Sequence, residues 1–205
     1  MPGFFLVHEG PDGAGKSTLA ATMARRARES GADVVAVREP GGTTVAEAAR
    51  AIVLDHSHAA GPEAELLLML AARADLVRKV IRPALEQGRL VIADRFDLST
   101  RAYQVAGRGL PAELVAAANT VATGGLEPDL TLVLDLAPEA GRRRQAAAGK
   151  ACDRLEAEGT DFHARVAAAY LAATGPGVQH LNAELPADRL AEAAWAELAK
   201  RWRQT

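Results

Sequence analysis

The chain has 205 residues, a formal net charge of −2 and only four lysines among its 24 basic residues. This balance argues against a general nucleic-acid or anionic-membrane surface, although a local basic pocket is compatible with it. The single cysteine, Cys152, excludes an internal disulfide bond and a thiolate zinc site. Apolar runs fall short of the ~18 residues of a membrane span and the start lacks a basic leader region, so we expect a cytoplasmic protein.

Short apolar segments alternate with longer helical patterns along the chain. The apolar segments are rich in Val and Leu, as strands covered on both faces are, and lie at 4–7, 33–37, 90–93, 130–134 and 178–181. Residues at helical spacing predict helices at 17–30, 44–54, 62–87, 111–123, 138–148, 161–174 and 187–201. This alternation predicts an α/β fold with a doubly wound, mostly parallel sheet that binds ligands at the carboxyl ends of its strands.

A phosphate-binding pattern, G-x-x-x-x-G-K-[ST], runs from Gly10 to Ser17. It follows the first predicted strand and opens the first predicted helix, which is the context that makes the pattern credible. A plain Gly-rich turn with a capping serine is the alternative, but such a turn requires neither Lys16 nor the full spacing. The pattern indicates a nucleoside triphosphate and Mg²⁺, with Lys16 at the β- and γ-phosphates and Ser17 as a metal ligand. The residues expected to bind ATP in this loop are Gly10, Gly13, Ala14, Gly15, Lys16, Ser17 and Thr18.

Two other predicted strands end in charged residues. Arg38 follows the strand at 33–37, and Asp94 and Arg95 follow the strand at 90–93. Asp94 is placed to accept a hydrogen bond from Mg²⁺-bound water, and Arg95 can fork onto a phosphate. Taken singly, each is compatible with a surface ion pair. At the same sheet edge as the phosphate loop, they indicate a site for a second, phosphorylated substrate.

Arg73 is the single charge in the middle of an apolar stripe on the helix predicted at 62–87. A buried charge without a partner is costly, so we expect Arg73 to have a polar partner. An internal ion pair with Asp or Glu is one interpretation. The other, favoured by the nearby phosphate loop, is a ligand contact, with Met69 one turn earlier lining the same cavity.

The chain resembles the bacterial thymidylate (dTMP) kinases, a family of P-loop nucleoside monophosphate kinases. Beyond the phosphate loop, the similarity is carried by Arg38-Glu39-Pro40-Gly41-Gly42-Thr43 and by segments 65–73, 94–104, 107–109, 128–135 and 153–156. The resemblance implies a five-stranded parallel sheet flanked by helices. It also implies one kinase domain over residues 1–205, a mobile lid at about 141–158, and a homodimer. The implied reaction moves the γ-phosphoryl group of ATP to a deoxynucleoside 5′-monophosphate, dTMP giving dTDP, with Mg²⁺.

The resemblance also implies roles for single residues. In the acceptor site, Arg38 and Arg95 would hold the phosphate, Asp12 would face the 3′-hydroxyl and help to order the metal, and Tyr103 would exclude a 2′-hydroxyl. The residues implied near the base are Met69, Arg73, Ser99 and Gln104. In the lid, Arg144 would lie near adenine and Arg154 near the phosphates. The residues implied in catalysis itself are Lys16, Arg95, Asp94, Asp12 and Arg154.

Three positions depart from the family pattern. Met69 stands where the family usually has a phenylalanine that stacks on thymine, and Arg101 replaces a residue that is commonly glutamine. The lid has alanines at 146–148 where two arginines are expected, a loss for which Lys150, Arg142, Arg143 or Arg154 could compensate. Two alternatives therefore stay open. One is a kinase of another or modified pyrimidine deoxynucleotide, and the other is a non-catalytic nucleotide-binding protein, which would not need Arg38 and Arg95.

Overall fold

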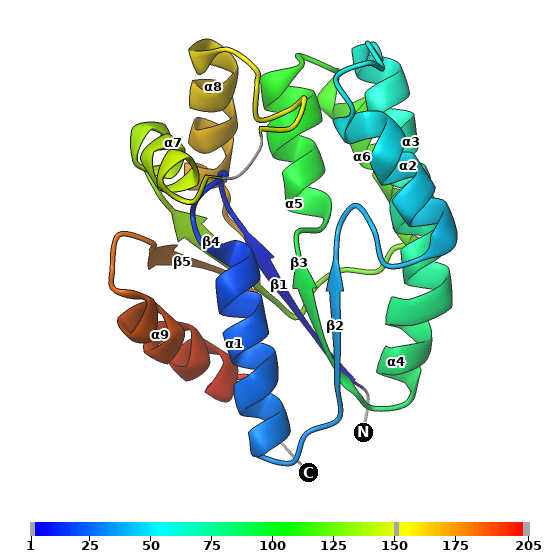
Figure 1. Ribbon diagram of the computed structural model, residues 1–205. Helices are drawn as coiled ribbons and strands as arrows, with labels where there is room; N and C mark the ends of the chain where they lie inside the picture. Colours follow the sequence, from blue (N-terminus) through cyan, green and yellow to red (C-terminus); the bar gives the residue numbers. More distant parts are fainter. Residues whose placement is uncertain (1–2, 150–151, 203–205) are drawn as a thin grey trace.

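The computed structural model describes residues 3–149 and 152–202 and has five parallel strands at its centre (Figure 1). The strands are β1 (Phe4–Glu9), β2 (Val34–Arg38), β3 (Leu90–Asp94), β4 (Leu130–Asp135) and β5 (Val178–Asn182), in the order β2-β3-β1-β4-β5. The prediction of a doubly wound five-stranded parallel sheet is confirmed. Since β1 is central and the order reverses beside it, the loop after β1 lies at the position where such sheets bind ligands.

Helices cover both faces of this sheet. They are α1 (Lys16–Glu29), α2 (Thr44–Leu54), α3 (Pro62–Leu76), α4 (Arg82–Glu86), α5 (Asp97–Thr100), α6 (Ala112–Thr123), α7 (Pro138–Ala147), α8 (Thr160–Leu171) and α9 (Ala187–Ala199), with π-helical segments η1 (Val77–Ile81) and η2 (Arg101–Gly107). Within the described residues, none of these helices combines the length and the apolarity needed to cross a membrane.

The core is divided by the sheet. On one face, α1 and α9 bury an aliphatic layer against β1, β3 and β4, including Leu6, Met23 and Leu198. On the other face, α3, η1 and α4 pack on Phe5 and its neighbours, while η2 and α8 pack near Val133. The central strands β1, β3 and β4 are buried along nearly their whole length, which explains why their apolar runs lack polar alternation.

The helix predicted at 62–87 is a continuous helical run with one irregularity. The N–H of Arg82 donates to the carbonyl of Val77, five residues earlier, so the chain makes a π-type turn at η1. The turn directly precedes Pro83, which has no N–H to continue the regular α-helical bonding. The change from α-helical to π-helical bonding therefore coincides with the missing N–H of Pro83.

The helical segment from Asp97 to Gly107 was not predicted, and this is a correction to the sequence interpretation. Its first turn is capped from another element, because Glu9 Oε1 at the end of β1 accepts from the N–H groups of Phe96 (2.8 Å) and Ser99 (3.1 Å). A capping side chain normally lies next to its helix in sequence. Here the capping residue is about 90 residues away in the chain, so no local sequence pattern indicates where the helix begins.

Candidate active site

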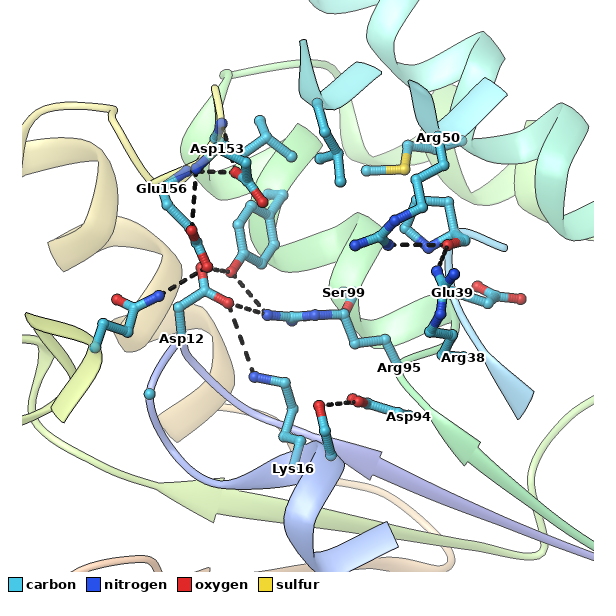
Figure 2. A pocket seen from close by; sticks show the side chains of 18 of the residues that line it. Asp12, Lys16, Arg38, Glu39, Arg50, Asp94, Arg95, Ser99, Asp153 and Glu156 are labelled. Atoms are coloured by element: carbon cyan, nitrogen blue, oxygen red, sulfur yellow. Dashed lines mark hydrogen bonds and ion pairs between the residues drawn. The ribbon is translucent and has the colours of Figure 1, made fainter. Parts of the chain in front are cut away.

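A pocket of about 390 Å³ lies at the carboxyl edge of the sheet, within the size range of small-molecule sites. Figure 2 shows Lys16 and Asp94 near the phosphate loop, Arg95 in the middle, and Asp153 and Glu156 opposite Arg38 and Arg50. The predicted site residues that line it are Asp12, Gly13, Gly15, Lys16, Ser17, Thr18, Arg38, Met69, Arg73, Asp94, Arg95, Ser99, Tyr103, Gln104 and Arg144. The predicted Gly10, Ala14 and Arg154 do not line it.

The phosphate loop needs its glycines for two separate reasons. Gly10 and Gly15 have φ values of 136° and 93°, which side chains rarely adopt. Gly13 lies so close to Gly141 of α7 that an added Cβ would meet the Gly141 carbonyl oxygen at 2.4 Å. Gly10 therefore shapes the loop without lining the pocket, and Gly13 lets the loop contact α7. Ala14 is buried in the core instead.

Lys16 lies at the start of α1 and is 6% exposed. Its Nζ donates to the carbonyl of Pro11 at 2.7 Å and lies 3.9 Å from Asp12 Oδ1. Burial and the nearby Arg95 lower the pKa of Lys16 to about 8, although Asp12 and Asp94 oppose that shift. The protein partners of the ammonium group therefore do not fully stabilise its charge, and a bound phosphate would stabilise it further.

Ser17 and Asp94 form the oxygen pair predicted for the metal. The Ser17 hydroxyl donates to Asp94 Oδ2 at 2.5 Å, which brings the start of α1 to the end of β3. In the sheet, Asp94 is in register with His8 on β1 and with Arg38 on β2. A serine hydroxyl and a carboxylate beside a phosphate loop suit Mg²⁺, which prefers oxygen ligands and keeps several waters and substrate phosphates in its coordination sphere.

Arg95 is the centre of the polar network in the pocket. Its Nη1 donates to Tyr170 Oη (2.9 Å), Ser99 Oγ (3.1 Å) and the Gly10 carbonyl (3.3 Å). Its Nη2 donates to Asp12 Oδ1 and to Tyr103 Oη, the latter at 3.2 Å. Arg95 also has a φ of 75°, the left-handed conformation that residues other than glycine seldom adopt. A strained backbone held by several elements is typical of a functional position.

Asp12 is the carboxylate at the centre of this network. Burial alone would raise its pKa, but Arg95 and Lys16 outweigh that effect and hold the pKa at about 2. Its Oδ2 also accepts from the Tyr103 hydroxyl at 2.7 Å. Asp12 is therefore ionised at neutral pH and aligns Arg95, Lys16 and Tyr103 along one side of the pocket.

Sequence reasoning missed two supporting residues, Glu9 and Tyr170. Glu9 is fully buried, and its Oε2 accepts from the hydroxyls of Ser99 (2.6 Å) and Tyr170 (3.2 Å). Burial raises the pKa of Glu9 to about 7, while Arg95 and Ser99 oppose this shift. Because Ser99 bonds to Glu9, Tyr170 and Arg95, its side chain braces Arg95 in this structure as well as lining the pocket.

The opposite side of the pocket carries two arginines. Arg38 Nη2 pairs with Glu47 at 2.9 Å, and its Nη1 donates to the Pro40 carbonyl at 2.9 Å. Arg50, which the sequence analysis did not single out, reaches the same carbonyl at 2.9 Å from α2 and lines the pocket. Its position, seven residues after the Arg-Glu-Pro-Gly-Gly-Thr motif on an amphipathic helix, is the signal that could have indicated it.

Arg73 makes the internal ion pair that one interpretation predicted, and it also lines the pocket, as the predicted ligand contact requires. Its Nε and Nη2 lie 2.7 Å from Glu39 Oε2, and Nη2 also donates to the Phe96 carbonyl at 2.8 Å. Its Nη1 donates to Thr100 (2.8 Å) and Asn119 (2.6 Å). All of its N–H groups are thus directed at protein oxygens, and a base that bonds to Arg73 must share one of these hydrogen bonds.

The lid side differs from expectation at Arg154. Arg144 lines the pocket and also a neighbouring cavity of about 350 Å³ with Arg143 and Glu184. Arg154 instead points away from the pocket, and its Nη2 lies 2.6 Å from Glu65 Oε2. Asp153 and Glu156, which the sequence analysis left without a role, line the pocket in its place. The expected lid also contains residues 150 and 151, among them Lys150, which lie outside the described residues.

The sheet order, the phosphate loop after its central strand and the carboxylate at the end of β3 define a P-loop nucleotide-binding protein. Comparison with known proteins narrows this class. The family model for thymidylate kinase matches residues 8–193.

Three similar proteins, each named thymidylate kinase, agree with that match. The chain is 49% identical over 183 residues to a protein of Pseudomonas entomophila, covering 89% of this chain and 87% of that one. It is 45% identical over 208 residues to a protein of Thermomicrobium roseum, covering 98% and 99% of the two chains. For a Deinococcus radiodurans protein the identity is 44% over 202 residues, with 97% and 98% covered. The chain belongs to the thymidylate kinase family, whose members are nucleoside monophosphate kinases.

Proposed function

We propose that the protein transfers the γ-phosphoryl group of ATP to dTMP, giving dTDP. The observation that carries this proposal is that the phosphate loop and the arginines Arg38 and Arg95 open into one pocket. A cluster of this kind can hold two phosphorylated substrates with the reacting phosphates adjacent. Phosphoryl transfer depends mainly on such positioning and on neutralising charge.

On the donor side, the loop N–H groups and Lys16 bind the β- and γ-phosphates of ATP. The N-terminus of α1 adds the positive end of its dipole to the same anion. We infer that the adenine binds in the neighbouring cavity, because Arg144 lines both that cavity and the main pocket. Because Arg144 Nη2 also donates to the Ala183 carbonyl at 2.9 Å, its guanidinium has a fixed place between the two cavities.

On the acceptor side, Arg38 and Arg95 hold the 5′-phosphate of dTMP, and Arg50 adds a third positive charge to that side of the pocket. Asp12 keeps Arg95 in place and presents a carboxylate to the sugar. Tyr103, whose hydroxyl donates to Asp12 at 2.7 Å, would lie against the sugar and exclude a 2′-hydroxyl. This arrangement favours deoxynucleotides.

We further propose that Mg²⁺ is bound by the Ser17 hydroxyl and, through water, by Asp94, where it would neutralise charge on the ATP phosphates. The chain's own contribution is to hold Ser17 and Asp94 at one end of the pocket. Both oxygens belong to rigid elements, the first turn of α1 and the end of β3.

The base specificity is tested by measuring ADP release with ATP–Mg²⁺ and a panel of acceptors: dTMP, dUMP, dCMP, CMP, UMP and dGMP. The proposal predicts the highest kcat/KM for dTMP. A preference for another pyrimidine deoxynucleotide would fit the departure at Met69 and would replace dTMP as the substrate. An absence of turnover with every acceptor would refute a kinase function and favour a nucleotide-binding protein without catalysis.

Met69 lines the pocket and provides a thioether where an aromatic ring would stack on a base. Stacking on an aromatic side chain contributes about 1–3 kcal/mol per base. We therefore expect Met69→Phe to lower the KM for dTMP about fivefold or more, with ATP binding unchanged. Met69→Leu is the matched control and should leave the KM within a factor of about two. An unchanged KM for dTMP in Met69→Phe would mean that Met69 does not face the base.

The low pKa of Lys16, about 8, predicts a particular pH dependence. Lys16 is protonated below this pH and attracts the triphosphate; above it the charge is lost. The kcat/KM for ATP reports the free enzyme, so it should fall about tenfold per pH unit above about pH 8. Bound phosphates raise the pKa of Lys16, so kcat should stay level to a higher pH. The descending limb should disappear from the residual activity of Lys16→Arg; its persistence there would assign it to another group.

We also propose one kinase domain with a lid at about 141–158, a cytoplasmic location and a homodimer. Large apolar side chains on α3 and α6 support the dimer, since Leu67, Leu114 and Val121 are 64%, 55% and 85% exposed in the single chain. Exposed apolar groups on adjacent helices are typical of interfaces between subunits. Sedimentation of the purified protein at several concentrations tests this state.

A further inference from the structure

Arg154 is surrounded by protein atoms on the side of its segment that faces away from the pocket. Its side chain is 12% exposed, its Nε donates to the Val53 carbonyl at 2.8 Å, and its Nη2 lies 2.6 Å from Glu65 Oε2. Its backbone N–H also donates to the Leu54 carbonyl at 3.2 Å. The residue is therefore fastened to the end of α2 and to the first turn of α3.

Glu65 accepts hydrogen bonds from this arginine and from two other side chains. It is fully buried, and its two oxygens also accept from Gln104 (2.8 Å) and from Arg108 (3.1 and 2.8 Å). Burial opposes ionisation of Glu65, but the hydrogen bonds from Arg108, Gln104 and Arg154 keep its pKa below the usual value. The carboxylate is thus charged at neutral pH and joins three segments that are distant in sequence.

The residues on either side of Arg154 point the other way. Asp153, Leu155 and Glu156 line the nucleotide pocket, and Figure 2 shows the two carboxylates on the same side of it as Asp12. Asp153 Oδ1 accepts from the N–H groups of Leu155 (3.0 Å) and Glu156 (2.9 Å), which makes a tight turn. Glu156 also accepts from Gln145 Nε2 at 2.7 Å and from the Asp153 N–H at 3.1 Å. Arg154 therefore holds the turn from the side that faces away from the pocket, while the two carboxylates lie on the pocket side.

We propose that Arg154 is a positioning residue that acts through Asp153 and Glu156. Its ion pair with Glu65 holds the turn in place, and the turn directs these two carboxylates toward the bound nucleotides. Carboxylates at this place can accept hydrogen bonds from sugar hydroxyls or from metal-bound water. This assignment rests on the proposed kinase function. It differs from the role that the family resemblance implies for Arg154, a direct contact with the phosphates.

A double-mutant cycle separates the two roles. Arg154→Met is made in the wild-type chain and in an Asp153→Asn/Glu156→Gln background, which removes both charges and keeps one carbonyl acceptor at each position. We expect Arg154→Met to lower kcat/KM about tenfold in the wild type and less than about twofold in the background. Arg25→Met, which removes an exposed pair with Glu29, is the control and should leave kcat/KM unchanged. A tenfold loss in both backgrounds would overturn the proposal and favour direct phosphate contact.

A second variant covers the case in which Arg154→Met does not fold. Arg154→Lys keeps the charge that pairs with Glu65 but cannot donate to Val53 at the same time. It should retain more than about a third of the wild-type kcat/KM, with melting temperature and circular dichroism near those of the wild type. A folded Arg154→Lys protein with a loss of tenfold or more would overturn the role of the ion pair. An inactive wild type would instead refute the proposed function itself, which keeps the two failures distinct.

Discussion

Replacing Arg95 by methionine should lower kcat/KM for dTMP by about 10³-fold or more, the range found when an arginine that stabilises transferring phosphate is lost. Arg95 contacts Asp12, Ser99, Tyr103 and Tyr170, so its guanidinium is held in one orientation before substrate binds. Methionine keeps much of the side-chain volume but provides neither charge nor donors. The loss should appear in steady-state kinetics with dTMP varied at saturating ATP.

The same substitution also removes the main cationic partner of Asp12. Asp12 is held at a pKa of about 2 by Arg95 and Lys16, and a buried carboxylate that loses a partner is costly. A lower melting temperature is therefore expected alongside the loss of activity. Arg95→Lys is the control. It keeps the charge near Asp12 but loses the bidentate hydrogen bonding of the guanidinium, so it should be intermediate in activity. If Arg95→Met is folded and within tenfold of the wild type, Arg95 does not hold the acceptor phosphate.

Replacing Lys16 by methionine has the second largest expected effect, a loss of about 10²–10³-fold in kcat, as for other single charge-stabilising groups. The ammonium lies at the helix N-terminus, where its charge and the α1 dipole act on the same phosphate. Rapid-quench measurement of dTDP formation in a single turnover would give the rate of the chemical step.

Thr18→Ala is a useful comparison for Lys16→Met because Thr18 lines the same pocket from the first turn of α1 but carries no charge. Thr18→Ala should lower kcat far less than Lys16→Met does. Equal losses in the two variants would show that the loop geometry, rather than the charge on Lys16, limits the rate.

The features that could be predicted from the sequence are those that neighbouring residues determine. The phosphate loop is defined by Gly10 to Ser17, and its strand and helix follow from local apolar patterns. Asp94 and Arg38 could be placed together because parallel strands bring their carboxyl ends to one edge, and the two residues are indeed in register.

The features that could not be predicted depend on contacts between distant residues. Glu9 caps the helix at Asp97 across about 90 residues, and Tyr170 reaches Arg95 from α8. Arg154 shows the same limit, since its partner Glu65 lies 89 residues earlier. A motif gives the residue types but not which side of a turn each side chain faces. In segment 153–156, Asp153, Leu155 and Glu156 face the pocket, whereas Arg154 faces Glu65.

The most direct test of phosphoryl transfer between the two substrates is to follow the label from [γ-³²P]ATP in the presence of dTMP and Mg²⁺. The arrangement of Lys16 and Arg95 around one pocket predicts that the label appears in the β-phosphate of dTDP, with little inorganic phosphate. Label found only in inorganic phosphate, or remaining in ATP with every acceptor offered, would contradict the proposed reaction.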